Sequence, residues 1–524
     1  LSLANAEGDI TITNNAGAMI SARGHSSFAV IQLNTAGNTT AGDIIVTNAG
    51  TIQALGAPYN NAANTWSHHT LRLSNITNGG TVTIDNSGTI EAGACCAINL
   101  NGTTDPITLT NSGTIKVETI GAISGRYTTN LTIVNSGTIT GAGTTNKSPD
   151  DADEGSIVLH NLNASGGSGA TITNSGTIEA SGLDYHAISI GTDDTGSAGY
   201  DNVTITNSGT IAGDQTTGNG VKGHAIRVLA DSSGTTITVK GEAVFTGGID
   251  LGKTVSTIVL DSSISTNITI NIYNYDEDLT ITNNLSGNDT YSLSSEDLDS
   301  DDDADDGVLS ILEAPTLSSS SPADGATGVG VNDNIVLTFS EAVDAESGNI
   351  VIKKSSDDSI VETIDVTGSK VSGSGSTTIT VDPSTTLDQA TGYYITIDAT
   401  AFDNASSVSY AGISDATTLN FNTGASNPLD DKDVVGSIEA QVDVAKQIIH
   451  HSTIPVLDRM EWLRRHREEN NLSHQGIKIS FSNPMFSSIS DALPVSTYFN
   501  PTAEVLPNNW AIWTKGSVTI GKTN

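Results

Sequence analysis

The sequence predicts an all-β protein: a right-handed parallel β-helix in the first half, followed by a β-sandwich. Three observations indicate this fold. A short phrase of the form Asn-Ser-Gly-Thr-Ile returns seven times before residue 212. The runs around it alternate between apolar residues and Thr, Ser or Glu, which is the period of a half-buried strand. Only 15% of the 524 residues are charged, while 53 are Gly, a composition that favours short strands and tight turns.

The repeated phrase sets the unit of the predicted β-helix. Its clear copies begin at Asn86, Asn111, Asn135, Asn174 and Asn207, and looser copies read Asn48-Ala49-Gly50-Thr51-Ile52 and Asn15-Ala16-Gly17-Ala18-Met19. Successive glycines lie 24 to 39 residues apart, so some units carry insertions. One short unit cannot bury its apolar face alone, and stacked units share a continuous core of Ile, Val and Leu.

Each unit reads as three short strands. In one of them, residues 171–173 alternate, residues 177–180 resume after the phrase, and His186-Ala187-Ile188-Ser189-Ile190 follows a turn. The third run returns as Cys96-Ala97-Ile98-Asn99-Leu100 and as His224-Ala225-Ile226-Arg227-Val228. We therefore expect three parallel strands per coil, with the right-handed sense of parallel crossovers.

The Asn and the Gly of the phrase have a structural and a functional interpretation. Asn tolerates the left-handed backbone region and can bond its equivalent one coil away, forming an amide ladder at a corner. The Gly would supply a second site of positive φ. Alternatively, the polar row could bind glycan. Because every copy lies between core strands, the structural interpretation is favoured.

The repeat array is assigned to residues 1–290. Its last part lacks the phrase, and the runs 258–260, 268–272 and 279–282 are expected to finish or cap the stack, since solenoids need atypical terminal units.

An acidic linker is predicted at residues 291–313. From Glu296 to Glu313 it carries nine acidic side chains and no basic one. Asp301, Asp303 and Asp305 alternate as in a Ca²⁺-binding loop, although Asp306 occupies the Gly position of that pattern. The run is either a solvated linker or a Ca²⁺ site that stiffens the joint. No other cofactor is expected.

Residues 314–424 are predicted to form a sandwich of about seven short strands. The opening Pro322-Ala323-Asp324-Gly325-Ala326, the run Leu337-Thr338-Phe339-Ser340-Glu341, Gly392-Tyr393-Tyr394 and Ala401-Phe402-Asp403 resemble a bacterial Ig-like domain of S-layer and other surface proteins. The resemblance implies a spacer or display role without chemistry.

Residues 425–475 are predicted to be a helical linker. Val435, Ile438, Val442, Ala445 and Ile449 follow a helical period from about Asp431. Pro455 is expected to interrupt it, with Thr453 capping a second helix. In residues 476–524, the run from Trp510 to Gly521 opens with aromatics and then alternates, as in an outer-membrane strand.

Together these parts resemble an autotransporter (type V secretion) protein. The repeats of residues 8–285 are similar to autotransporter passenger domains, and residues 476–524 resemble the junction and first strand of a truncated autotransporter β-barrel. The resemblance implies a helix that threads the barrel, an outer-membrane anchor and a passenger at the cell surface. Since the chain starts at Leu1 and stops in mid-pattern at Asn524, we expect an internal fragment of a longer protein.

Enzyme motifs are not found in the sequence: it contains no G-x-S-x-G, H-E-x-x-H, P-loop or C-x-x-C. The ten His are scattered and are expected to be surface or corner residues. A net charge of -38 argues against binding nucleic acid. The only two cysteines, Cys95 and Cys96, are adjacent and cannot staple distant segments.

Two functions remain open at this point. The first is a non-enzymatic adhesin or display stalk that binds a host-cell or environmental glycan or protein. The second is a glycan-degrading or peptidase passenger. Either would use the insertions as its binding face, at residues 54–70, 141–156, 191–202 and 212–223.

Overall fold

The structure, a computed structural model, falls into two units, residues 1–423 and 424–524, and each is described by itself. It describes residues 1–4, 8–23, 29–34, 42–55, 69–77, 79–93, 96–118, 121–142, 155–160, 169–182, 185–191, 199–215, 223–299, 305–425 and 432–465.

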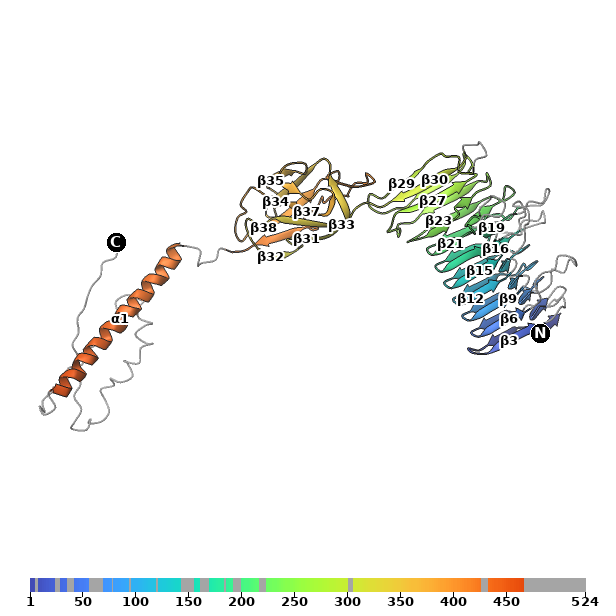
Figure 1. Ribbon diagram of the computed structural model, residues 1–524, viewed down its shortest axis with the longest axis horizontal. Coiled ribbons are helices and arrows are strands. Elements are labelled where there is room, and N and C mark those ends of the chain that lie inside the picture. The colour runs from blue at the N-terminus through green and yellow to red at the C-terminus, as the bar shows by residue number, and fades with distance from the viewer. Residues whose placement is uncertain are drawn as a thin grey trace. The chain divides into compact units, whose positions relative to one another are not determined.

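The first part of unit one is a stack of parallel strands in three sheets (Figure 1). Sheet A contains β1 (Ser2–Ala4), β4 (Ile31–Asn34), β7 (Leu71–Leu73), β10 (Ile98–Asn99), β13 (Ile123–Ser124), β16 (Gly155–Leu159), β19 (His186–Ile190), β22 (Ile226–Val228), β25 (Ile249–Asp250), β27 (Ile268–Tyr273), β30 (Gly307–Leu312) and β29 (Thr290–Leu293). Sheet B contains β2 (Ile10–Asn14), β5 (Ile44–Asn48), β8 (Val82–Asn86), β11 (Ile107–Asn111), β14 (Leu131–Asn135), β17 (Thr171–Asn174), β20 (Thr204–Asn207), β23 (Thr235–Val239), β26 (Ser256–Leu260) and β28 (Thr280–Asn283). Sheet C contains β3 (Met19–Arg23), β6 (Thr51–Leu55), β9 (Thr89–Ala92), β12 (Thr114–Val117), β15 (Thr138–Ala142), β18 (Thr177–Ser181), β21 (Thr210–Ala212) and β24 (Val244–Thr246).

Each full coil supplies one strand to sheet B, one to sheet C and one to sheet A. Strands of successive coils pair in register, so that Ile84 lies opposite Leu109 in sheet B and Ile115 opposite Ile139 in sheet C. These side chains are fully buried in one core that runs through the stack. The parallel stacking fits the predicted β-helix. In sheets B and C, alternation directs about one residue in two of each strand inward.

The asparagines of the repeat form an unbroken ladder at the corner between sheets B and C. Each side-chain amide donates to the side-chain oxygen of the next coil's asparagine. The donor–acceptor distance is 2.7 Å for the pairs Asn14–Asn48, Asn48–Asn86 and Asn86–Asn111, and 2.8 Å for Asn111–Asn135, Asn135–Asn174 and Asn174–Asn207. The predicted amide ladder is thus present. Its first member is Asn14 rather than Asn15, because Asn14 pairs with Asn48 and one extra residue follows it.

The prediction of left-handed backbone at this corner is wrong. None of the ladder asparagines has a positive φ, and among the glycines of the phrase only Gly17 does, at 75°. The other glycines are needed for close approach. A Cβ built on Gly137 would overlap the carbonyl oxygen of Gly113 in the preceding coil, and the same holds for Gly113 against Gly88. The phrase requires glycine because two backbones touch there.

The stack ends with antiparallel strands. β30 pairs antiparallel with both β27 and β29, so sheet A closes on a strand pair rather than on another coil. The described part of residues 291–313, predicted as a linker, therefore contributes strands to the stack. Of the runs expected to finish or cap the stack, β26 is an inner member of sheet B. β28 is the last strand of sheet B, and β27 is the last parallel strand of sheet A before the antiparallel β30.

The second part of unit one has two five-stranded sheets around their own core. One contains β31 (Leu317–Ser321), β33 (Ile335–Ala345), β37 (Ser376–Val381), β36 (Val371–Ser372) and β39 (Phe402–Asn404). The other contains β32 (Ala326–Val329), β40 (Asn420–Thr423), β38 (Gly392–Ile397), β34 (Asn349–Lys354) and β35 (Ile360–Asp365). Leu337, Ile352, Ile395 and Phe402 are among the buried side chains, which accounts for the alternation in the sequence.

Unit two is described only as the helix α1 (Lys432–Arg465). It is one helix of 34 residues, so the predicted break at Pro455 is wrong. A proline removes one backbone donor and strains one turn, and a long helix can continue past it. Residues 466–524, including the predicted barrel strand, lie outside the described residues. Within the described part of the chain, no helix is both long and apolar enough to cross a lipid bilayer.

Candidate functional site

The last turn of the stack gathers three aspartates. The chain leaves β29, turns back and enters β30, and an isolated antiparallel bridge joins Glu296 to Asp306 across this turn. Asp306 is almost completely buried, at 1% exposure. Its two side-chain oxygens accept hydrogen bonds from the backbone N–H of Asn274 (2.9 Å) and of Leu298 (3.0 Å). The carboxylate is therefore fixed by backbone donors, and its charge is stabilised by them.

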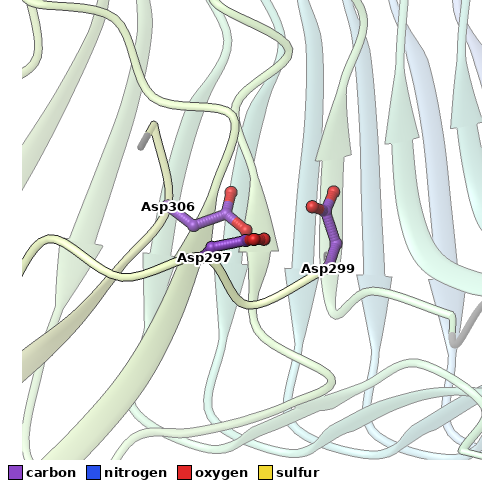
Figure 2. Close-up of side chains that lie close together, drawn as sticks. All are labelled: Asp297, Asp299 and Asp306. Carbon is purple, nitrogen blue, oxygen red and sulfur yellow. The ribbon is translucent and has the colours of Figure 1, made fainter. Parts of the chain in front are cut away.

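Asp297 and Asp299 complete this acidic cluster. Both are exposed, and one oxygen of each lies within 4.8 Å of the other and of an oxygen of Asp306. Figure 2 shows Asp297 beside Asp306, with Asp299 approaching from the other side. Three converging carboxylates are the ligand type that Ca²⁺ prefers, since this ion takes six to eight oxygens at about 2.3–2.6 Å. The cluster could supply three of them and leave the others to water or backbone.

The sequence-predicted Ca²⁺ ligands are placed differently. Asp301 and Asp303 lie outside the described residues, so their role stays a prediction. Asp305 is described, and its carboxylate forms an ion pair of 2.8 Å with Lys253 rather than joining the cluster. The three clustered aspartates belong to the same acidic run of residues 296–313. A linear loop pattern selected other members because it does not include the fold-back that brings residue 306 against residue 297.

A second polar cluster lies in sheet A, along β19, β22, β25 and β27. His186 and His224 stand opposite each other in successive coils, with parallel rings whose centroids are 5.4 Å apart. The backbone N–H of His224 donates to Nδ1 of His186 at 2.9 Å, which fixes Nδ1 as an acceptor. Tyr273 meets the His224 ring edge-on, at 4.8 Å. The result is a stack of three rings along the sheet.

Charged groups surround the imidazoles. Nε of Arg227 lies 3.5 Å from Oδ2 of Asp250, and Nε2 of His224 lies 3.9 Å from the same oxygen. The side chain of Asn274 donates to the other oxygen of Asp250 at 3.0 Å. Asp250 is 7% exposed and needs these partners, because an isolated buried carboxylate is costly.

Both histidines are held neutral. Burial lowers the pKa of His186 well below 6.5. The charge of Arg227, and repulsion whenever His224 is protonated, lower this pKa further. Burial also lowers the pKa of His224, while Asp250 and the Gly247 carbonyl oppose that shift. His186 is buried within β19, and His224 is partly buried. The expectation of surface or corner histidines is therefore wrong for His186, and His69 and His160 are buried as well. The signal was in the sequence, since two copies of the third strand begin with His.

The four insertions border sheet A. Residues 54–70, 141–156 and 212–223 connect a strand of sheet C to one of sheet A, and residues 191–202 connect sheet A to sheet B. Most of their residues lie outside the described ones. At the corner of the asparagine ladder, by contrast, two residues separate the sheet B strand from the following sheet C strand in every coil from β5 to β20. The connections between strands therefore vary in length only at the corners that the asparagine ladder does not constrain.

A comparison with known protein families finds one match. Residues 312–423 match the model of a bacterial Ig-like domain. This agrees with the resemblance of residues 314–424 and with the two-sheet core described above. No curated protein and no solved structure matches the chain.

Proposed function

We propose that this chain, of which residues 312–423 form a bacterial Ig-like domain, is a non-enzymatic passenger of an autotransporter. In this proposal the three-sheet stack is a right-handed parallel β-helix that acts as adhesin or display stalk at the cell surface. The Ig-like domain is a spacer, and a C-terminal outer-membrane barrel exports and anchors the passenger. The ligand is a glycan or protein of a host cell or of the surroundings.

One observation carries the proposal. The chain's most repeated feature, the Asn-Ser-Gly-Thr-Ile phrase, is used by contacts between coils rather than by a binding or catalytic groove. Adding such a coil lengthens the stack without changing its cross-section, and a stalk requires this property. The adjoining Ig-like domain is likewise a structural module. The same features in an acidic chain of net charge -38 suit a protein displayed in solution rather than one bound to nucleic acid.

The experiment compares binding with turnover. The full chain and a variant lacking residues 212–223 are tested for attachment to cells and to immobilised glycans, and for cleavage of polysaccharide and peptide panels. We expect attachment that the deletion weakens, and no cleavage product from either panel. Turnover of a polysaccharide or peptide that disappears when residues 212–223 are deleted would instead identify a glycan-degrading or peptidase passenger.

A further inference from the structure

The outer face of sheet B carries two ranks of threonine. Strand alternation leaves two outward positions on each of its ten strands, and in-register pairing aligns them from coil to coil. The first rank reads Thr11, Ile45, Thr83, Thr108, Thr132, Thr171, Thr204, Thr236, Thr257 and Thr280. The second rank reads Thr13, Thr47, Asp85, Thr110, Val134, Thr173, Thr206, Thr238, Val259 and Thr282. Sixteen of the twenty positions are threonine.

These side chains are available to a ligand. None of the twenty is buried. Among the described residues, only one hydroxyl of the two ranks bonds to protein, that of Thr280, which donates to the carbonyl of Asp278 at 3.5 Å. The other fifteen threonines lie at outward positions of their strands, and no hydrogen bond within the described residues uses their hydroxyls.

The two ranks form a rigid grid. Strands lie about 4.8 Å apart, and two residues along a strand span about 6.6 Å. Threonine is stiff at χ1, so each methyl and each hydroxyl keeps a fixed direction. Such a grid presents apolar and hydrogen-bonding groups at repeats of about 4.8 Å and about 6.6 Å, which is the scale on which oxygen atoms repeat in crystalline ice.

The other two sheets do not carry such a face. One outward rank of sheet C is also rich in threonine, but its second rank includes Gln53, Glu91, Lys116 and Glu179, with a 2.9 Å ion pair between Lys116 and Glu91. The outward rank of sheet A includes Arg72, Arg227 and Asp250. Intrinsic strand propensity explains single threonines on any sheet. It does not explain why the two ranks of sheet B together contain a single charged residue, Asp85.

We infer that the outer face of sheet B is a binding surface for ice. The fixed methyl groups would hold a layer of water in the ice spacing, and the hydroxyls would hydrogen-bond to it without displacing it. A crystalline polysaccharide is the weaker candidate, because no aromatic residue for stacking on sugar rings stands at any of the twenty positions. This inference does not depend on how the protein is exported or anchored.

The test uses the full chain. Adsorption of the fluorophore-labelled chain to a single ice crystal is imaged, and thermal hysteresis, the gap between melting and freezing points, is measured. Thr204→Lys places a long charged side chain in the middle of the first rank. Thr210→Lys is the matched control, on the same coil but on sheet C. We expect the unaltered chain and Thr210→Lys to adsorb to ice and depress its growth, and Thr204→Lys to lose both effects.

The inference is overturned if the unaltered chain does not adsorb to ice, or if the two lysine variants behave alike. Adsorption to cellulose or chitin that Thr204→Lys abolishes, without adsorption to ice, also overturns it. If Thr204→Lys lowers the unfolding midpoint, Thr204→Val and Thr204→Ser decide. Val keeps the shape and should retain adsorption, while Ser loses the methyl group and should weaken it. Equal adsorption by these two variants would contradict the role of the methyl grid.

Discussion

The side-chain amide of Asn111 donates a hydrogen bond of 2.8 Å to the side-chain oxygen of Asn135, its equivalent in the next coil. Both residues are fully buried. Each link of this ladder depends on the next, because an asparagine presents one amide donor upward and one oxygen acceptor downward. Replacing one member therefore leaves a buried donor on one side and a buried acceptor on the other.

We expect Asn135→Ala to lower the free energy of unfolding by about 1–3 kcal/mol for each buried group left without a partner. Urea unfolding of the full chain followed by circular dichroism measures this change. Ser136→Ala is the control, since this exposed corner residue makes only a 3.5 Å contact with the carbonyl of Asn111. Equal stability of the two variants would mean that the ladder contributes nothing.

Gly137→Ala tests the close contact between coils. Its Cβ would overlap the Gly113 carbonyl oxygen, so the two coils must separate. Overpacking of this kind costs about 1–3 kcal/mol. Gly436→Ala is the opposite control, because Gly436 lies in α1 with open space around it and alanine should raise helix stability by about 0.5–1 kcal/mol. A neutral Gly137→Ala would contradict the contact that explains the repeated glycine.

The buried histidines predict loss of stability in mild acid. The pKa of His186 and of His224 is lowered in the folded chain from 6.5, so the unfolded chain binds protons more readily as pH falls below 6.5. Stability from these rings is present above pH 6.5 and is lost below it. We expect the unfolding midpoint to fall between pH 7.5 and about pH 5.

His186→Asn should reduce that pH dependence. The side-chain oxygen of Asn can accept the N–H of His224 in place of Nδ1 and does not titrate. His450→Asn, on the exposed helix α1, should leave it unchanged. An identical pH dependence in the unaltered chain and in His186→Asn would refute the assignment.

Ca²⁺ binding by the acidic cluster is a further prediction. We expect isothermal titration to detect binding at about 10⁻³ M or below, the range of extracellular modules. Asp299→Asn should abolish it, while Asp398→Asn in the Ig-like domain should not. Absence of heat at these concentrations would leave the acidic turn as a solvated segment.

The sequence predicted those parts of the fold that follow from a regular spacing of apolar residues and of the repeated phrase. Alternation and the repeated phrase were sufficient for the three parallel sheets and for the ladder, since both depend on local spacing. The strand pair of β29 and β30 was missed because an acidic run resembles a linker, and its antiparallel pairing is non-local. The continuous helix through Pro455 was missed because helix propensity is local and does not state how much strain a long helix can absorb.

The candidate sites were less predictable. Asp306 meets Asp297 only after the chain folds back, and the linear spacing of carboxylates cannot express this. His186 and His224 were visible as a repeated position, yet their burial depends on the packing of neighbouring coils. The threonine ranks of sheet B are written in the sequence as Thr-x-Thr. Their alignment into a grid requires the registers that the structure supplies.

The proposed function requires that the passenger is displayed at the cell surface. It is tested most directly by expressing the complete reading frame in a Gram-negative host and labelling intact cells with an antibody against residues 312–423. We expect labelling that protease treatment of intact cells removes. Ig-like domain that is detected only after the cells are lysed would contradict it.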